Sequence, residues 1–201
     1  MKKPTQRKAF TLVELLTVIA VIGILISILV PVSSAAFDMV KKAQSRNQFK
    51  NFSIALTAYK TEYGAYPTFF ANEDGYNINT DTDEFIIALQ GRNYEGDVPD
   101  SAANNRLLKN FYAFNESDFY EYEPASSVRK IADAFGNNGI LIAVDVNGNG
   151  RLEALPDPDD PLTATVDLQS KVAVWSDPRA HAPSGSDPND VSSLEWVFSY
   201  D

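Results

Sequence analysis

One acidic residue, Glu14, stands inside an apolar stretch that covers residues 10–30 and holds no other charged side chain. A carboxylate in the middle of a membrane-spanning helix costs about 3 kcal/mol on insertion scales, and less near the membrane edge. Glu14 therefore needs either the headgroup region of a bilayer or a cation that pairs with it. Only the second interpretation gives Glu14 a function, and it makes this residue a candidate for a contact with a partner.

Oxygen-bearing side chains gather in two further stretches, and oxygen is the ligand that calcium prefers. In the run DVNGNGR, Asp145, Asn147 and Asn149 occupy the first, third and fifth positions of an EF-hand-like loop. Gly150 holds the sixth position, but Pro156 stands where the loop would need a bidentate acid at the twelfth. Asn-Gly runs are also typical of β-hairpin turns. The pattern therefore predicts either a partial metal site or a hairpin turn.

The second oxygen-rich stretch lies near the C-terminus and is interrupted by prolines. It comprises Ser176, Asp177, Asp187, Asp190 and Ser192. Four or five such oxygens on one short segment can surround a calcium ion, which accepts irregularly placed ligands. The alternative is an acidic loop that is only solvated.

Catalytic chemistry has little support in this sequence. There is one histidine, His181, in a loop rich in Pro, Ser and Gly, and there is no cysteine. Neither a Gly-x-Ser-x-Gly elbow nor a Gly-x-x-x-x-Gly-Lys loop occurs. We therefore predict that the protein is not an enzyme.

The element that positions Glu14 is the apolar stretch itself, which as a helix is roughly 30 Å long and can cross a bilayer. A short leader rich in Lys and Arg precedes it, and the positive-inside rule then keeps the N-terminus cytoplasmic. An ordinary signal peptide carries its small cleavage-site residues after the apolar region. Here the small residue, Ala9, comes before that region, so cleavage after Ala9 leaves the helix in the mature chain.

The run Ala-Phe-Thr-Leu-Val-Glu at residues 9–14 resembles the type IV pilin and pseudopilin family. The resemblance implies that a prepilin peptidase cuts between Ala9 and Phe10 and methylates the new amino group of Phe10. It also implies that Glu14 pairs with the N-terminal amine of a neighbouring subunit during assembly. The sequence departs from the family in one respect, because Ala9 stands where glycine is usual.

The helical pattern continues beyond the apolar stretch to Tyr63, where Gly64 can take a left-handed cap. From residue 32 the helix is amphipathic, with apolar side chains three or four residues apart: Phe49, Phe52, Leu56, Tyr59 and Tyr63. This periodicity predicts one long helix whose second half buries a stripe in a folded domain.

Shorter elements follow the long helix. We expect a helix at 84–90, a helix or strand at 105–114, and strands at 139–144, 168–175 and 195–200. The fold class predicted is α+β and pilin-like: a long N-terminal helix with a membrane-spanning first half, and a C-terminal antiparallel β-sheet packed on its second half.

Composition narrows the choice of partners and cofactors. The formal net charge is −10 although the leader is basic, and an acidic domain repels nucleic acid, so no nucleic-acid partner is expected. Many adhesive type IV pilins close their C-terminal loop with a disulfide, so the lack of cysteine favours a secretion pseudopilin. In the major pseudopilins the last loop binds calcium. The resemblance therefore makes calcium the one expected cofactor and favours the C-terminal group of ligands.

These observations predict a prepilin leader at 1–9, a transmembrane and assembly helix at 10–31, and a periplasmic head at 32–201 that includes the second half of the long helix. We expect a structural subunit of a type II secretion pseudopilus, closest to the major pseudopilin. It would be a single-pass inner-membrane protein that polymerises into a periplasmic filament and helps drive folded proteins across the outer membrane.

The expected partners are further copies of the chain, other pseudopilins, the prepilin peptidase, the inner-membrane secretion platform and membrane lipid. Two alternatives stay open. One is a type IV pilin for adhesion, motility or DNA uptake, and the other is a membrane-anchored binding module.

Overall fold

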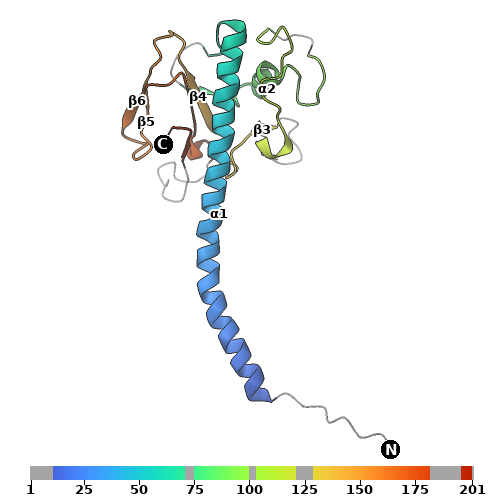
Figure 1. Ribbon diagram of the computed structural model, residues 1–201, viewed down its shortest axis with the longest axis vertical. Helices are drawn as coiled ribbons and strands as arrows, with labels where there is room; N and C mark the ends of the chain where they lie inside the picture. The colour runs from blue at the N-terminus through green and yellow to red at the C-terminus, as the bar shows by residue number, and fades with distance from the viewer. Residues whose placement is uncertain (1–10, 71–74, 100–102, 121–128, 182–195, 201) are drawn as a thin grey trace, which may run out of the picture. The chain divides into compact units, whose positions relative to one another are not determined.

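The computed structural model describes residues 11–70, 75–99, 103–120, 129–181 and 196–200 (Figure 1). The chain divides into two compact units, a first unit that ends at Val40 and a second unit that begins at Lys41. Helix α1 (Leu12–Tyr63) contributes to both units. Because the later elements include an antiparallel sheet, the fold is α+β and the predicted fold class is confirmed.

In the first unit, α1 begins directly after Thr11 and runs on without interruption through Gly23 and Pro31. Its large apolar side chains are exposed, for example Leu12 at 79% and Ile28 at 62%. Within residues 11–40, the described part of this unit, α1 is the sole element. This half of the helix therefore has no core of its own to enter.

In the second unit, α1 supplies the predicted apolar stripe. Phe49, Phe52 and Leu56 are fully buried there. The helix ends where the Gly64 N–H donates to the Lys60 carbonyl at 2.8 Å and Gly64 takes a φ of +79°. This left-handed cap confirms the predicted end of the helix.

A four-stranded antiparallel sheet, in the order β1–β4–β7–β8, shares a core with this part of α1. Its strands are β1 (Tyr76–Asn77), β4 (Ile140–Val144), β7 (Val172–Ser176) and β8 (Val197–Phe198). Two smaller antiparallel pairs join β2 (Phe119–Tyr120) to β3 (Lys130–Ile131), and β5 (Leu152–Pro156) to β6 (Thr165–Leu168). The other elements are α2 (Thr82–Gln90) and two 3₁₀ helices, η1 (Glu116–Asp118) and η2 (Pro178–His181). Figure 1 shows β4, β5 and β6 on one side of this part of α1 and α2 and β3 on the other.

Both faces of the central sheet are buried, which explains why its strands read as continuous apolar runs. On one face Ile142 of β4 and Val174 of β7 join the core that contains the α1 stripe. On the other face Ala143 and Trp175 pack with Leu152 from the β5–β6 pair. Successive side chains of a strand point to opposite faces, so a strand covered on both sides needs apolar residues at every position.

The expected helix at 84–90 and the expected strand at 139–144 are confirmed by α2 and β4. The prediction for 105–114 is wrong, because this segment forms neither helix nor strand. The Asn105 side chain organises it instead: its Nδ2 donates to the Ala88 and Lys109 carbonyls at 3.0 and 2.7 Å, and its Oδ1 accepts from the Lys109 N–H at 3.0 Å. A side-chain amide thus replaces the backbone ladder that a regular element would need.

The expected strand at 168–175 is also corrected. Leu168 ends β6 and Val172 begins β7, so the run contains two strands and the turn between them. Ser170 marks that turn, since its hydroxyl donates to the Val172 carbonyl at 2.9 Å. The predicted last strand corresponds to β8, although residue 195 lies outside the described residues.

Candidate functional site

The Glu14 carboxylate caps the start of its own helix. Its Oε2 accepts hydrogen bonds from the Thr11 backbone N–H at 2.8 Å and from the Thr11 hydroxyl at 2.7 Å. The Glu14 backbone N–H in turn donates to Thr11 Oγ1 at 3.3 Å. This reciprocal arrangement is a capping box, and a negative charge there also suits the positive end of the helix dipole. Glu14 is exposed, and the hydrogen bonds from Thr11 orient its carboxylate.

The expected partner of Glu14 lies outside the described residues, as do both residues of the expected cleavage site, Ala9 and Phe10. Their roles in processing and assembly stay predictions. Among the residues that the structure describes, no helix offers a stretch long and apolar enough to cross a membrane. The segment boundaries predicted at residues 9 and 31 also stay predictions.

The C-terminal group of candidate calcium ligands is described only in part, because Asp187 and Asp190 lie outside the described residues. Ser176, buried at the end of β7, donates its hydroxyl to Asp133 Oδ2 at 2.8 Å. Asp177 pairs with Arg179, whose Nε and Nη2 lie 2.9 and 2.6 Å from Oδ1 and Oδ2. Both described members thus have protein partners, and calcium binding by this group stays a prediction.

The partner of Ser176, Asp133, is a buried carboxyl that sequence reasoning did not select as a site residue. Its Oδ1 accepts from the backbone N–H groups of Phe135 and Asn137, each at 2.9 Å. Burial raises the pKa of Asp133, and these hydrogen bonds oppose that rise without cancelling it. The sequence signals a turn here through Gly136-Asn137, but it carries no sign that the carboxyl is buried.

The loop between β4 and β5 holds the other candidate ligands. Asp145 is 1% exposed, and its Oδ2 accepts the Gly150 N–H at 3.0 Å. Its Oδ1 has no hydrogen-bond partner. Asn147 Oδ1 accepts from the Asn149 N–H at 2.9 Å, and Asn149 Oδ1 accepts from the Arg151 N–H at 2.7 Å. The structure therefore brings the predicted first, third and fifth positions into one tight loop.

The hairpin interpretation of this loop is wrong, because β4 pairs with β7 and β5 pairs with β6. Within the described ranges, no group of three or more His, Cys, Asp or Glu side chains could hold a metal ion. A cation in this loop would therefore depend on one carboxylate together with amide and carbonyl oxygens.

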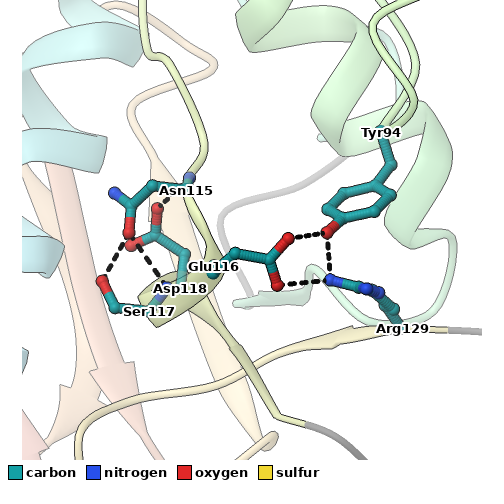
Figure 2. A network of polar contacts seen from close by, with 6 residues as sticks. All are labelled: Tyr94, Asn115, Glu116, Ser117, Asp118 and Arg129. Atoms are coloured by element: carbon teal, nitrogen blue, oxygen red, sulfur yellow. Dashed lines mark hydrogen bonds and ion pairs between the residues drawn. The ribbon is translucent and has the colours of Figure 1, made fainter.

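A polar network holds the segment between α2 and β3 (Figure 2). Glu116 accepts from the Tyr94 hydroxyl at 2.6 Å and from Arg129 Nη1 at 2.7 Å, and Arg129 also donates to the Tyr94 hydroxyl. The hydrogen bond from Tyr94 lowers the pKa of Glu116, and the same bond raises the pKa of Tyr94. These hydrogen bonds connect Tyr94, which follows α2, to Arg129, which precedes β3.

The neighbouring Asp118 ties this segment to α1. Its Oδ1 accepts from Gln48 Nε2 at 3.1 Å and from the Tyr112 hydroxyl at 2.9 Å, while its Oδ2 accepts the Asn115 N–H at 2.9 Å. Beside it lies a cavity of about 290 Å³, whose lining includes Asn47 and Tyr112. The lining residues are neutral, so this cavity pairs no nucleophile with a charged base.

Comparison with known proteins adds three matches. Residues 4–30 match the family described as the prokaryotic N-terminal methylation motif. Over 63 residues, 31% of this chain and 44% of the relative, the chain is 33% identical to type II secretion system core protein G of Pseudomonas aeruginosa. Over 90 residues, 44% of this chain and 55% of the relative, it is 36% identical to fimbrial protein EcpB of Eikenella corrodens. The chain thus spans about half the length of the curated relatives it matches.

No solved structure matches this chain. The methylation motif and the two relatives support the predicted resemblance to the type IV pilin and pseudopilin family. The motif implies a membrane-anchored N-terminus and a processed mature chain. Within the family, both a secretion pseudopilin and a fimbrial pilin are consistent with the matches.

Proposed function

We propose that this chain is a structural subunit that assembles through α1 into a filament, and that the filament is a type II secretion pseudopilus. The observation that carries the proposal is the exposed apolar surface of α1 between Leu12 and Ile28, with Glu14 as its one charged residue. Soluble monomers rarely expose contiguous apolar patches larger than a few hundred Å². Lipid would cover this surface before assembly, and the α1 helices of other copies would cover it afterwards.

Processing prepares the contact that assembly needs. Cleavage between Ala9 and Phe10 by the prepilin peptidase would create a cationic N-terminus close to the first turn of α1. Thr11 already orients the Glu14 carboxylate at that end of the helix. In a stack of parallel helices, the Phe10 amine of one subunit would meet Glu14 of the next. Two unit charges about 4 Å apart attract by roughly 4 kcal/mol at an effective dielectric constant of about 20.

The head in this proposal is structural and not catalytic. The cavity beside Asp118 is lined by neutral side chains, and Glu116 and Asp133 are hydrogen-bonded to their neighbours. The head would lie in the periplasm and present an acidic surface. The inner-membrane secretion platform, the peptidase and other pseudopilins are the proposed partners.

The secretion role rests on the similarity to the Pseudomonas protein, whose name assigns it to a type II secretion system, and on the absence of a cysteine pair. A type IV pilin is the second candidate, favoured by the similarity to the Eikenella fimbrial protein. A membrane-anchored binding module is the third, and it predicts a chain that never enters filaments.

Deletion of the gene in its host, with complementation by the wild-type chain, separates these candidates. A pseudopilin predicts that folded exoproteins accumulate in the periplasm of the deletion strain and that complementation restores them to the medium. A pilin predicts normal secretion together with a loss of surface filaments. Normal secretion and normal surface filaments in the deletion strain would refute both filament roles.

A further inference from the structure

The Asp145 carboxylate is almost fully buried, but only one of its two oxygens accepts a hydrogen bond. Oδ2 accepts the Gly150 N–H, whereas Oδ1 is buried and has no hydrogen-bond partner. A buried charged oxygen without a partner is costly, and buried charges in proteins are normally paired or coordinate metals. The bond to Gly150 also directs the carboxylate across its own loop.

The basic side chains of this region do not satisfy that oxygen. Lys60 Nζ donates to the Asp145 backbone carbonyl at 3.1 Å and lies 4.5 Å from the centre of the Tyr66 ring. Arg151 pairs with Asp167 at 2.6 Å. Among the described residues, no basic side chain forms an ion pair with the Asp145 carboxylate. In the part of the chain that the structure describes, Oδ1 therefore has neither a hydrogen-bond partner nor an ion pair.

The same loop supplies further oxygens at regular intervals. Asn147 Oδ1 and Asn149 Oδ1 each accept one backbone N–H, and an amide oxygen has two lone pairs, so each keeps one for another ligand. Gly148 and Gly150 take left-handed φ values of +75° and +77°, which fold the chain back on itself. Asn147 and Asn149 thereby lie in the same short loop as Asp145, between that residue and the Gly150 N–H that it accepts.

We propose that this loop between β4 and β5 binds one calcium ion. The ligands would be Asp145 Oδ1, the side-chain oxygens of Asn147 and Asn149, and the main-chain carbonyl of Arg151, with water completing the sphere. Calcium accepts six to eight oxygens in irregular geometry, whereas magnesium demands a near-ideal octahedron. Bound calcium would supply the positive charge that the buried carboxylate lacks.

The proposed site is weak, because it has one carboxylate and Pro156 occupies the position of the bidentate acid. We expect a dissociation constant of about 10⁻⁴ to 10⁻³ M, the range of extracellular calcium modules. The ion would bind where the end of α1 meets the sheet, since Lys60 donates to the Asp145 carbonyl and the Asp145 N–H donates to the Lys171 carbonyl at 2.9 Å. The site is independent of the filament role and of the C-terminal acidic loop.

The test is a calcium titration of the full chain in detergent micelles. Binding is measured by calorimetry and by the NMR amide signals of Gly148 and Gly150. The wild-type chain should show saturable shifts of both signals with the dissociation constant given above, and magnesium should compete poorly. Asp145→Asn should abolish these shifts. Its fold should persist, because the new amide oxygen can still accept the Gly150 N–H.

Asn147→Asp adds a second carboxylate and should tighten calcium binding several-fold, an outcome that a folding defect cannot imitate. Two controls should bind as the wild type does: Asp159→Asn, which removes an exposed charge outside the loop, and the double variant Asp187→Ala, Asp190→Ala. The proposal is overturned if calcium leaves both glycine signals unchanged, if Asp145→Asn binds as the wild type does, if Asn147→Asp gives no gain, or if the double variant removes the shifts.

Discussion

Replacing Glu14 by Gln separates two roles that one carboxylate can play at the start of α1. The first role is the capping box with Thr11, which is worth about 1 kcal/mol to a helix. Gln also serves in capping boxes, so Glu14→Gln should keep most of that stabilisation. The second role is the proposed ion pair with the amine of a neighbouring subunit, whose Coulomb attraction is roughly 4 kcal/mol at a separation of about 4 Å, before the cost of desolvating the two charges. Glu14→Gln should lose that attraction, so the association constant should fall by up to about a thousandfold.

We therefore expect the Glu14→Gln chain to enter the membrane fraction normally and to form almost no filaments. The assay is the yield of sheared, sedimented filaments, compared with the amount of processed chain in the membrane. Thr11→Val is the matched control, because it removes the hydroxyl that caps the helix but leaves the carboxylate charged. This control should assemble at close to wild-type yield, because the backbone N–H of residue 11 still donates to the Glu14 carboxylate. If Glu14→Gln assembles normally while Thr11→Val does not, capping is the function of Glu14 and the ion-pair reasoning is refuted.

Three further predictions follow from the chain and its core. Mass spectrometry of the protein from its host should find an N-methylated chain that starts at Phe10, and a mature chain starting at Met1 would contradict the processing step. Burial raises the pKa of Asp133, so the contribution of this residue to folding stability should be greatest below the ordinary Asp pKa of about 3.9. That contribution should be lost as the pH rises through the folded-state pKa. Asp133→Asn should remove this part of the pH dependence in chemical denaturation, and an unchanged difference between variant and wild type at all pH values would disprove it. Phe52→Ala should lower the free energy of unfolding by about 3–5 kcal/mol, because the fully buried ring contacts the rings of both Phe85 and Tyr112. The control is Ile54→Ala at an exposed position, which should change the free energy of unfolding by less than about 0.5 kcal/mol.

The parts of the fold that the sequence predicts well are those with a strong period. The apolar residues of the α1 stripe recur every three or four positions, which predicts a helix. The apolar run of β4 is bounded by turn residues, which predicts a short strand. The β5–β6 pair was not predicted. Its register shifts between Leu152 and Leu155, and Ala154 in that bulge has a φ of +56°, so the apolar side chains do not alternate. A bulged strand loses the two-residue period by which strands are recognised.

Spacing alone predicted the Asp145 loop as a candidate site, because its candidate ligands are close neighbours in the chain. The partnership of Asp133 with Ser176 could not be predicted in this way, since the two residues are brought together only when β7 enters the sheet. The unpartnered Oδ1 of Asp145 was also beyond sequence reasoning. Its significance depends on burial and on the absence of an ion pair to that carboxylate among the described residues, and both are properties of the folded second unit.

The two parts of the continuous helix α1 differ in how their side chains are buried. From Ser45 onward its side chains enter the core of the second unit: Ser45 is buried and accepts the Ala134 N–H at 2.9 Å, and Phe49 follows one turn later. Between Leu12 and Ile28 the same helix exposes its large apolar side chains. The later part of α1 therefore contributes to the core of the second unit, whereas the earlier part leaves its apolar surface exposed. Because residues far apart without shared partners contribute almost additively, assembly and folding can change independently along this one helix.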